Sequence, residues 1–202
     1  MLGRTILSVC LLPAFLALSC GKIPTDPNST SPFNELAYVN NEWGFQVSRP
    51  SEEWGLNVQT FELQRESNGK ARVEVRMARP FAEGVSTPFR PQMFLQPAAL
   101  NEITALQDLV VRYEGTLKDA FEGYEQQGEK QSVNLGNDEA VQWQFRKNPF
   151  AGQNSRFPGT RFLAAVVVRN REAYFMLGNG VRGDFPQQGY QAIVRSLRFV
   201  DK

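Results

Sequence analysis

The sequence predicts an α+β fold in which a central antiparallel β-sheet is sandwiched between helices. Two apolar runs, residues 162–168 and 173–177, flank a short polar turn, which is typical of an antiparallel hairpin. No polar residue interrupts the first run, so we expect the sheet to be covered on both faces, with Val166 and Val167 buried on opposite sides. An amphipathic helix is expected near the end of the chain, and it covers part of one face of the sheet. Its apolar residues lie at helical spacing: Tyr190, Ile193, Val194 and Leu197.

Four strands are expected in the first part of the domain. Residues 36–39 and 44–48 predict two short strands, the second stopped by a proline. Residues 58–64 and 72–78 predict a hairpin across residues 67–70, where an Asn-Gly pair supplies the positive φ of a tight turn. In the last of these strands charged residues alternate with Val and Met. One of its faces is therefore expected to be exposed to solvent, which places this strand nearer an edge of the sheet.

Residues 79–99 are rich in Pro and Phe and predict an irregular loop with a short strand at residues 93–95. A long helix follows, and residues 104–107 resemble a capping box at its start. We expect this helix to pack on the sheet through one continuous apolar stripe: Leu106, Leu109, Val110, Tyr113, Leu117, Ala120, Phe121 and Tyr124. A further hairpin, residues 131–135 and 140–145, precedes a second long loop at residues 147–160.

Residues 178–183 spell G-x-G-x-x-G between the second apolar run and the last helix. A dinucleotide site needs this motif inside a βαβ unit, whereas here the preceding strand belongs to an antiparallel hairpin. We therefore interpret the glycines as the turn into the last helix, with Asp184 available as its cap.

The first residues resemble the signal of a bacterial lipoprotein. Arg4 precedes an apolar segment at residues 6–18 that is too short to span a membrane, and residues 16–21 resemble a lipobox ending at Cys20. Leu16 lies one position earlier than in the commonest form, and an ordinary secretory signal with a stray cysteine is the alternative. The resemblance implies cleavage before Cys20 and acylation of its thiol, which would anchor the protein stably to a membrane.

This interpretation divides the chain into three parts. Residues 1–19 are the signal peptide, residues 20–33 a tether rich in Pro, Ser and Thr, and residues 34–202 the folded domain. We expect the domain to face the periplasm of a bacterial cell envelope. The outer membrane is the expected site, because Gly21 follows the cysteine where an Asp would resemble an inner-membrane retention signal.

Composition removes several kinds of chemistry. The chain has no histidine, and the interpretation above leaves the domain without a thiol, because Cys10 leaves with the signal and Cys20 is acylated. Ser-His-Asp and Cys-His catalysis and zinc sites built from His or Cys are therefore excluded, and no cofactor is expected. The 22 Lys and Arg include Arg4, so removal of residues 1–19 leaves 21 basic against 21 acidic side chains. This balance gives no general attraction to nucleic acid.

Two regions of the sequence resemble a known superfamily. The first part combines Tyr38, a Gly-Phe-Gln-Val-Ser-Arg-Pro stretch at residues 44–50 and Trp54; the last combines a hairpin with residues 190–199. This pattern, over residues 36–200, is similar to the PsbP-like superfamily of photosystem II extrinsic subunits, eukaryotic Ran-binding relatives and bacterial lipoproteins. The resemblance implies an antiparallel sheet between helices. It carries over no functional residue, because the metal-linked histidines of the photosynthetic members have no counterpart here.

The two long loops supply the candidate site. They combine arginine and phenylalanine, which are enriched at protein interfaces, and form one partner-binding surface if their strands end at the same edge of the sheet. The alternative is that the phenylalanines anchor the loops and the arginines only solubilise them. The candidate residues are Arg79, Phe81, Phe89, Arg90, Arg146, Lys147, Phe150, Arg156, Phe157 and Arg161.

The function that follows is a non-catalytic, lipid-anchored binding or assembly-accessory domain, with a protein or an envelope component as its partner. Two alternatives remain open at this stage. One is an enzyme that uses carboxylates alone, and the other is a carrier of a small apolar ligand beneath the long helix. An enzyme would present convergent acids in a cleft, whereas a binding domain would present a surface lined by loops.

Overall fold

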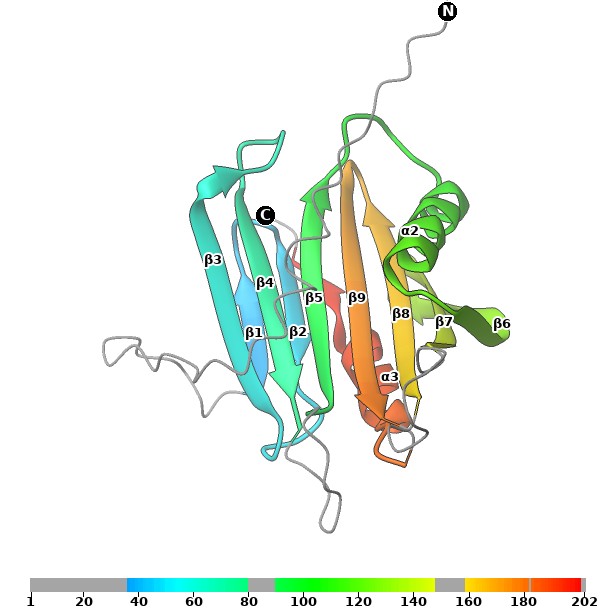
Figure 1. Ribbon diagram of the computed structural model, residues 1–202. Coiled ribbons are helices and arrows are strands. Elements are labelled where there is room, and N and C mark those ends of the chain that lie inside the picture. Colours follow the sequence, from blue (N-terminus) through cyan, green and yellow to red (C-terminus); the bar gives the residue numbers. More distant parts are fainter. Residues whose placement is uncertain (1–35, 80–89, 148–158, 182, 201–202) are drawn as a thin grey trace, which may run out of the picture. The chain divides into compact units, whose positions relative to one another are not determined.

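The computed structural model describes residues 36–79, 90–147, 159–181 and 183–200. By its internal contacts the chain divides into two units, Met1–Pro32 and Phe33–Lys202, and all described residues lie in the second. This unit is built on an antiparallel seven-stranded sheet with the order β3-β4-β5-β9-β8-β7-β6 (Figure 1). The strands are β3 (Gly55–Arg65), β4 (Ala71–Ala78), β5 (Gln92–Ala99), β6 (Tyr124–Leu135), β7 (Asp138–Lys147), β8 (Thr160–Arg169) and β9 (Glu172–Val181).

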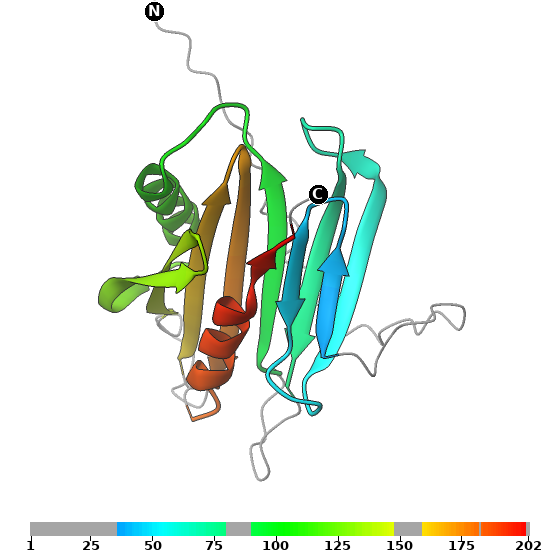
Figure 2. The same ribbon diagram turned by 180° about the vertical axis from the view of Figure 1, so that it is seen from behind.

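Different elements cover the two faces of this sheet. Helix α2 (Leu106–Ala120) contacts β7 and β8 on the face turned to the viewer in Figure 1. The opposite face, seen in Figure 2, carries helix α3 (Gln187–Ser196) and a small antiparallel sheet. The strands of this small sheet are β1 (Ala37–Asn40), β2 (Phe45–Ser48) and β10 (Arg198–Phe199). The predicted α+β fold with a sheet between helices is confirmed, and a second sheet shares one of the two faces with α3.

The core lies on both sides of the β8–β9 hairpin. Val166 and Val167 are both 0 % exposed. Val167 belongs to the core beneath α3 and the small sheet. Val166 pairs with Phe175, whose ring lies 4.8 Å from that of Tyr113 on α2, so it faces the other way. The prediction that these valines are buried on opposite faces is confirmed, because an uninterrupted apolar run suits a strand that is covered twice.

Strand β5 is the largest departure from the prediction. The sequence indicates only a short strand at residues 93–95, whereas β5 has 8 residues and lies between β4 and β9. Pro97, which lacks an N–H and argues against an interior strand, is tolerated because the pairing with β4 ends at Leu95 opposite Val75.

Both ends of α2 also differ from the prediction. The N-cap is Ala105, without a side-chain cap, and the Thr104 hydroxyl donates to the Glu102 carbonyl at 3.3 Å, so the capping box is wrong. The helix ends at Ala120, and Gly123, at φ 72°, turns the chain into β6. The last residue of the predicted apolar stripe therefore lies in a strand.

Residues 178–181 of the glycine motif belong to β9, so the interpretation of the motif as a turn is wrong for these residues. A Cβ at Gly178 would lie 2.9 Å from the Tyr190 ring, and one at Gly180 would lie 2.6 Å from the Asp184 carbonyl. These glycines let α3 and the segment before it pack directly on the strand. Asp184 does not cap α3, whose N-cap is Pro186; its carboxylate pairs with Arg79 instead.

Candidate functional site

The strand register defines two ends of the seven-stranded sheet. Ala78 pairs with Gln92, Gln92 with Asn179, Asn179 with Phe162, and Phe162 with Phe145. These residues form one row across five strands, next to the points where both long loops begin and end. We call this the loop end. The opposite end carries the β3–β4 and β8–β9 turns, and we call it the turn end.

The register meets the condition for a shared loop surface. The described candidates lie at the loop end: Arg79 follows β4, Arg90 precedes β5, Arg146 and Lys147 close β7, and Arg161 is the second residue of β8. The remaining candidates lie outside the described residues, as does the lipidation candidate: Phe81, Phe89, Phe150, Arg156, Phe157 and Cys20.

Several of these cations have partners inside the protein. Arg79 forms an ion pair with Asp184, whose side chain is 1 % exposed, and the Arg90 Nε donates to the Arg79 carbonyl at 2.9 Å. Arg146 Nη2 lies 2.6 Å from a carboxylate oxygen of Glu125 on the neighbouring strand. These contacts fix strand ends and the bases of loops, so arginine content alone does not make this end a recognition surface.

The turn end holds a pocket with a volume of about 620 Å³. Its lining comes from five segments that are distant in sequence, within residues 43–44, 67–70, 100–101, 169–174 and 199–200. The turns that join strand pairs and the chain after β10 meet here, because Gly44, at φ 68°, accepts a 2.9 Å hydrogen bond from the Val200 N–H. The volume suits a small organic ligand or the end of a chain.

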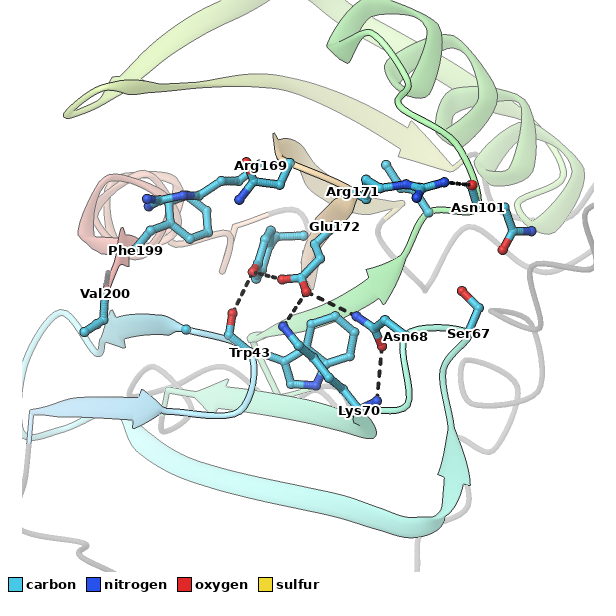
Figure 3. Close-up of a pocket in the computed structure, with 14 residues that line it drawn as sticks. Trp43, Ser67, Asn68, Lys70, Asn101, Arg169, Arg171, Glu172, Phe199 and Val200 are labelled. Atoms are coloured by element: carbon cyan, nitrogen blue, oxygen red, sulfur yellow. Dashed lines mark hydrogen bonds and ion pairs between the residues drawn. The ribbon is translucent and has the colours of Figure 1, made fainter. Parts of the chain in front are cut away.

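Glu172 lies at the centre of the pocket (Figure 3). Its carboxylate forms an ion pair with Lys70 and accepts a hydrogen bond from Asn68 Nδ2 at 3.1 Å. The Tyr174 hydroxyl lies 2.9 Å from Glu172 Oε2 and 2.9 Å from the Trp43 carbonyl, and its one proton serves one of them at a time. Burial, and secondarily the charge of Glu172, raise the pKa of Tyr174 well above its usual value, so this hydroxyl stays a donor.

Cations and rings surround this carboxylate. Figure 3 shows Arg169 and Arg171 on one side of Glu172, with Lys70 and Trp43 on the other. The Arg169 guanidinium lies 4.9 Å from the centre of the Phe199 ring, and the Lys70 ammonium lies 4.9 Å from the Trp43 ring. Arg171 Nη2 donates to the Asn101 carbonyl.

The backbone of the β8–β9 turn sets this arrangement. Asn170 has φ 58°, a left-handed conformation that Asn adopts more readily than most residues. The tight turn at this residue carries Arg169 and Arg171 on either side of it. Sequence reasoning missed the pocket, because its residues belong to separate turns. The one available signal is the Arg-Asn-Arg-Glu sequence of residues 169–172, which is unusually charged for a turn between two buried strands.

Three further features of the described part of the chain bear on other kinds of site. No group of three His, Cys, Asp or Glu in it is arranged to hold a metal ion. Beneath α2, aromatic rings are in contact, with centroid distances of 4.8 Å for Tyr113–Phe175 and 4.6 Å for Phe121–Phe162. None of the described helices combines the length and apolar character that crossing a bilayer requires.

Comparisons with known proteins bear on the fold. No protein-family model and no curated protein matches the chain. Among solved structures, it is similar to cyanobacterial PsbP (CyanoP) from Synechocystis sp. PCC 6803, with a TM-score of 0.52 and 12% identity over 81% of this chain and 91% of that one.

Two further solved structures are more distant. One is the protein of unknown function PA94 from Pseudomonas aeruginosa, a putative regulator, with a TM-score of 0.48 and 10% identity over 82% of this chain and 97% of that one. The other, from Bacteroides thetaiotaomicron, has a TM-score of 0.47 and 8% identity over 82% of this chain, which spans only 48% of its length. On the similarity to CyanoP, the chain has a PsbP-like fold.

Proposed function

We propose that this protein is a non-catalytic binding domain, anchored by a lipid on the periplasmic side of a bacterial cell envelope, and that it recognises its partner through the pocket at the turn end. The observation that carries this proposal is the set of contacts that the Glu172 carboxylate makes. Its carboxylate is engaged by Lys70, Asn68 and Tyr174, while Arg169 and Arg171 line the same pocket. A pocket that combines an internally engaged carboxylate with two arginines in its lining supports the proposal of a binding site.

The arrangement favours binding over catalysis. Hydrolysis by carboxylates alone needs two acids facing each other across the reacting bond. Among the described lining residues Glu172 is the one carboxylate. The Glu172 carboxylate pairs with Lys70 and is within hydrogen-bond distance of Asn68 Nδ2 and the Tyr174 hydroxyl, so its oxygens are engaged within the fold. Glu172 therefore serves to position Lys70 and Tyr174.

The carrier alternative is less favoured, because the space beneath α2 is occupied. The Phe145 and Phe162 rings stack at 4.6 Å, and Tyr124 stacks on Phe145 at 4.5 Å. Rings at these distances are in direct contact and stabilise the fold. An apolar ligand would have to displace them.

The anchor rests on the sequence of residues 16–21 and is tested separately. A fatty-acid analogue fed to cells that express the protein should label the wild-type chain and leave Cys20→Ala unlabelled and uncleaved. Label retained by this variant would refute lipidation at Cys20. The tether of residues 20–33 would then need another role.

Recognition is tested by photo-crosslinking in native membranes. A photoreactive residue in place of Ser67, an exposed residue of the pocket rim, should form a discrete adduct. The matched control is Ser132, which is also exposed but lies on β6 at the far edge of the sheet. The same adducts from both positions, or none from Ser67, would contradict the proposal that the pocket binds a partner.

A further inference from the structure

We infer that the pocket takes a singly charged carboxylate joined to a small apolar group, and that Arg171 is the residue that recognises the carboxylate. This inference rests on the proposed function, since it names the ligand class of the same pocket. Free organic acids and the C-terminal residues of proteins share this chemistry. The charges, donors and walls of the pocket each support it.

The charge of the pocket fits a monoanion. Among the described residues, Lys70, Arg169 and Arg171 supply three positive charges to the lining and Glu172 one negative charge. Asp138 lies outside the lining, but its carboxylate oxygen is 3.6 Å from Arg169 Nη1 and offsets the charge of that arginine. Three positive and two negative charges leave one positive charge in excess. A carboxylate balances that excess, whereas a phosphate dianion would reverse it.

Arg171 has the donors that a carboxylate needs. A guanidinium carries five N–H donors in a planar fork, and the hydrogen bond to the Asn101 carbonyl uses one of them. Arg171 is exposed at the pocket rim, so it can meet an entering anion before the ligand reaches the more enclosed Lys70–Glu172 pair. Charge-assisted, bidentate hydrogen bonds of this kind are about twice as strong as neutral ones.

The remaining wall is apolar. Leu100 and Phe199 are half-buried, and Val200 is 43 % exposed, so together they leave hydrocarbon surface facing the pocket. Burial of an aliphatic side chain against such a wall contributes about 25 cal/mol per Å² of apolar area removed from water. A carboxylate that carries an aliphatic group would use both parts of the site at once.

The test is calorimetric titration of the full lipidated chain in detergent. The first probe is acetyl-Ala-Ala-Leu with a free carboxyl group, and the second is its C-terminal amide. Hexanoate represents a free acid without a peptide, and inorganic phosphate represents a different oxyanion. We expect the acid peptide to bind at least tenfold more tightly than its amide and more tightly than phosphate.

The variants assign the effect to Arg171. Arg171→Glu should weaken binding of the acid peptide at least tenfold, and Arg171→Gln, which keeps a hydrogen-bond donor, should weaken it less. The matched control is Arg112→Glu, the same charge reversal at an exposed arginine on α2. It should leave the affinity unchanged. If Arg171→Glu does not fold, as judged by its Tm, Arg171→Gln decides the outcome by itself.

Each outcome decides the inference. If both hexanoate and the acid peptide bind, the site takes carboxylates in general. If only the peptide binds, the site takes the C-terminal ends of chains. Both results support the inference. Equal affinity for acid and amide, preference for phosphate, no binding of any probe, or full affinity in the Arg171 variants overturns it. If the Ser67 adduct forms while no carboxylate binds, the ligand class is wrong and the proposed function stands. If carboxylates bind while Ser67 forms no adduct, the proposed function fails instead.

Discussion

The two ends of the seven-stranded sheet both carry arginines, but these arginines have different surroundings. At the loop end Arg79 pairs with the buried Asp184, and Arg146 pairs with Glu125. At the turn end, Arg169 pairs with Asp138 and Arg171 donates to the Asn101 carbonyl, but both arginines line a pocket whose own carboxylate is engaged by a lysine. Arginines that fix strand ends and arginines that line a cavity look alike in a sequence. The pocket that the turn-end arginines line distinguishes them.

Both ends belong to one seven-stranded sheet that is covered on both faces. Val166→Asp and Val167→Asp should each lower the free energy of unfolding by about 4 kcal/mol or more, because each places an unpaired charge among apolar side chains. Val111→Asp, at a position of α2 that is 68 % exposed, should change it by less than about 0.5 kcal/mol. Denaturant unfolding measures all three. A tolerated Asp at either buried position would mean that this face is open.

The next largest effect should separate the two ion pairs of the loop end. Asp184→Ala leaves the Arg79 guanidinium without its buried partner, so it should destabilise the protein by about 3 kcal/mol. Glu125→Ala removes the partner of Arg146 from a pair in which both side chains are nearly half-exposed, and should cost less than about 1 kcal/mol. Equal losses in thermal and denaturant unfolding would show that both pairs play the same part.

A third prediction concerns alkaline pH and compares one tyrosine from each end. Burial raises the pKa of Tyr174 at the turn end and of Tyr190 at the loop end well above the unfolded value of about 10. The folded state therefore keeps protons that the unfolded state releases above pH 10. Stability should be fully present below pH 10 and should fall by up to about 1.4 kcal/mol per pH unit for each tyrosine above it.

The measurement is the free energy of unfolding between pH 8 and pH 11.5, with Tyr174→Phe and Tyr190→Phe as variants. Each variant should show a shallower decline than the wild type. Tyr124, whose pKa burial raises to about 12, contributes in the same direction but is partly exposed, so Tyr124→Phe should change the slope less. A pH-independent stability above pH 10 would contradict the burial of these hydroxyls.

The smallest effect should appear in ligand affinity. Glu172→Gln removes a negative charge from the pocket, so it should tighten binding of acetyl-Ala-Ala-Leu by roughly fivefold, or about 1 kcal/mol. Glu125→Gln makes the same change at the loop end and should leave the affinity unchanged. Calorimetric titration of both variants with the peptide measures the two affinities. Weaker binding in Glu172→Gln would mean that Glu172 contacts the ligand or that its ion pair shapes the pocket.

Much of the fold follows from local patterns in the sequence. The apolar run around Val166 and Val167 predicts a strand covered on both faces, and the alternation around residues 72–78 predicts a strand with one wet face near an edge. Strand β5 could not be predicted in full, because Pro97 reads as a breaker unless the end of the β4 pairing is known. The helical stripe also runs past Ala120, since a periodic pattern does not record where tertiary contacts end a helix.

The pocket at the turn end could not be predicted from the sequence, for a physical reason. The two long loops can be recognised in the sequence by their composition. The strand register does bring Arg79 and Arg161, which lie beside these loops, to the same end of the sheet. The pocket instead needs residues 43, 68, 100, 171 and 199 to meet, and their contacts join segments that local periodicity cannot relate. Its charge balance depends on which carboxylate faces which cation, and that is fixed only by the complete fold.

We propose that recognition takes place at the turn end and not at the loop end. Amide hydrogen exchange tests this, by comparing the full chain in membranes of the cells that express it with the same chain purified in detergent. We expect slower exchange in the membrane at residues 67–70 and 169–172, with no change at residues 90–92 and 159–161. Protection confined to the loop-end residues would contradict it and would assign recognition to the surface around Arg90 and Arg161.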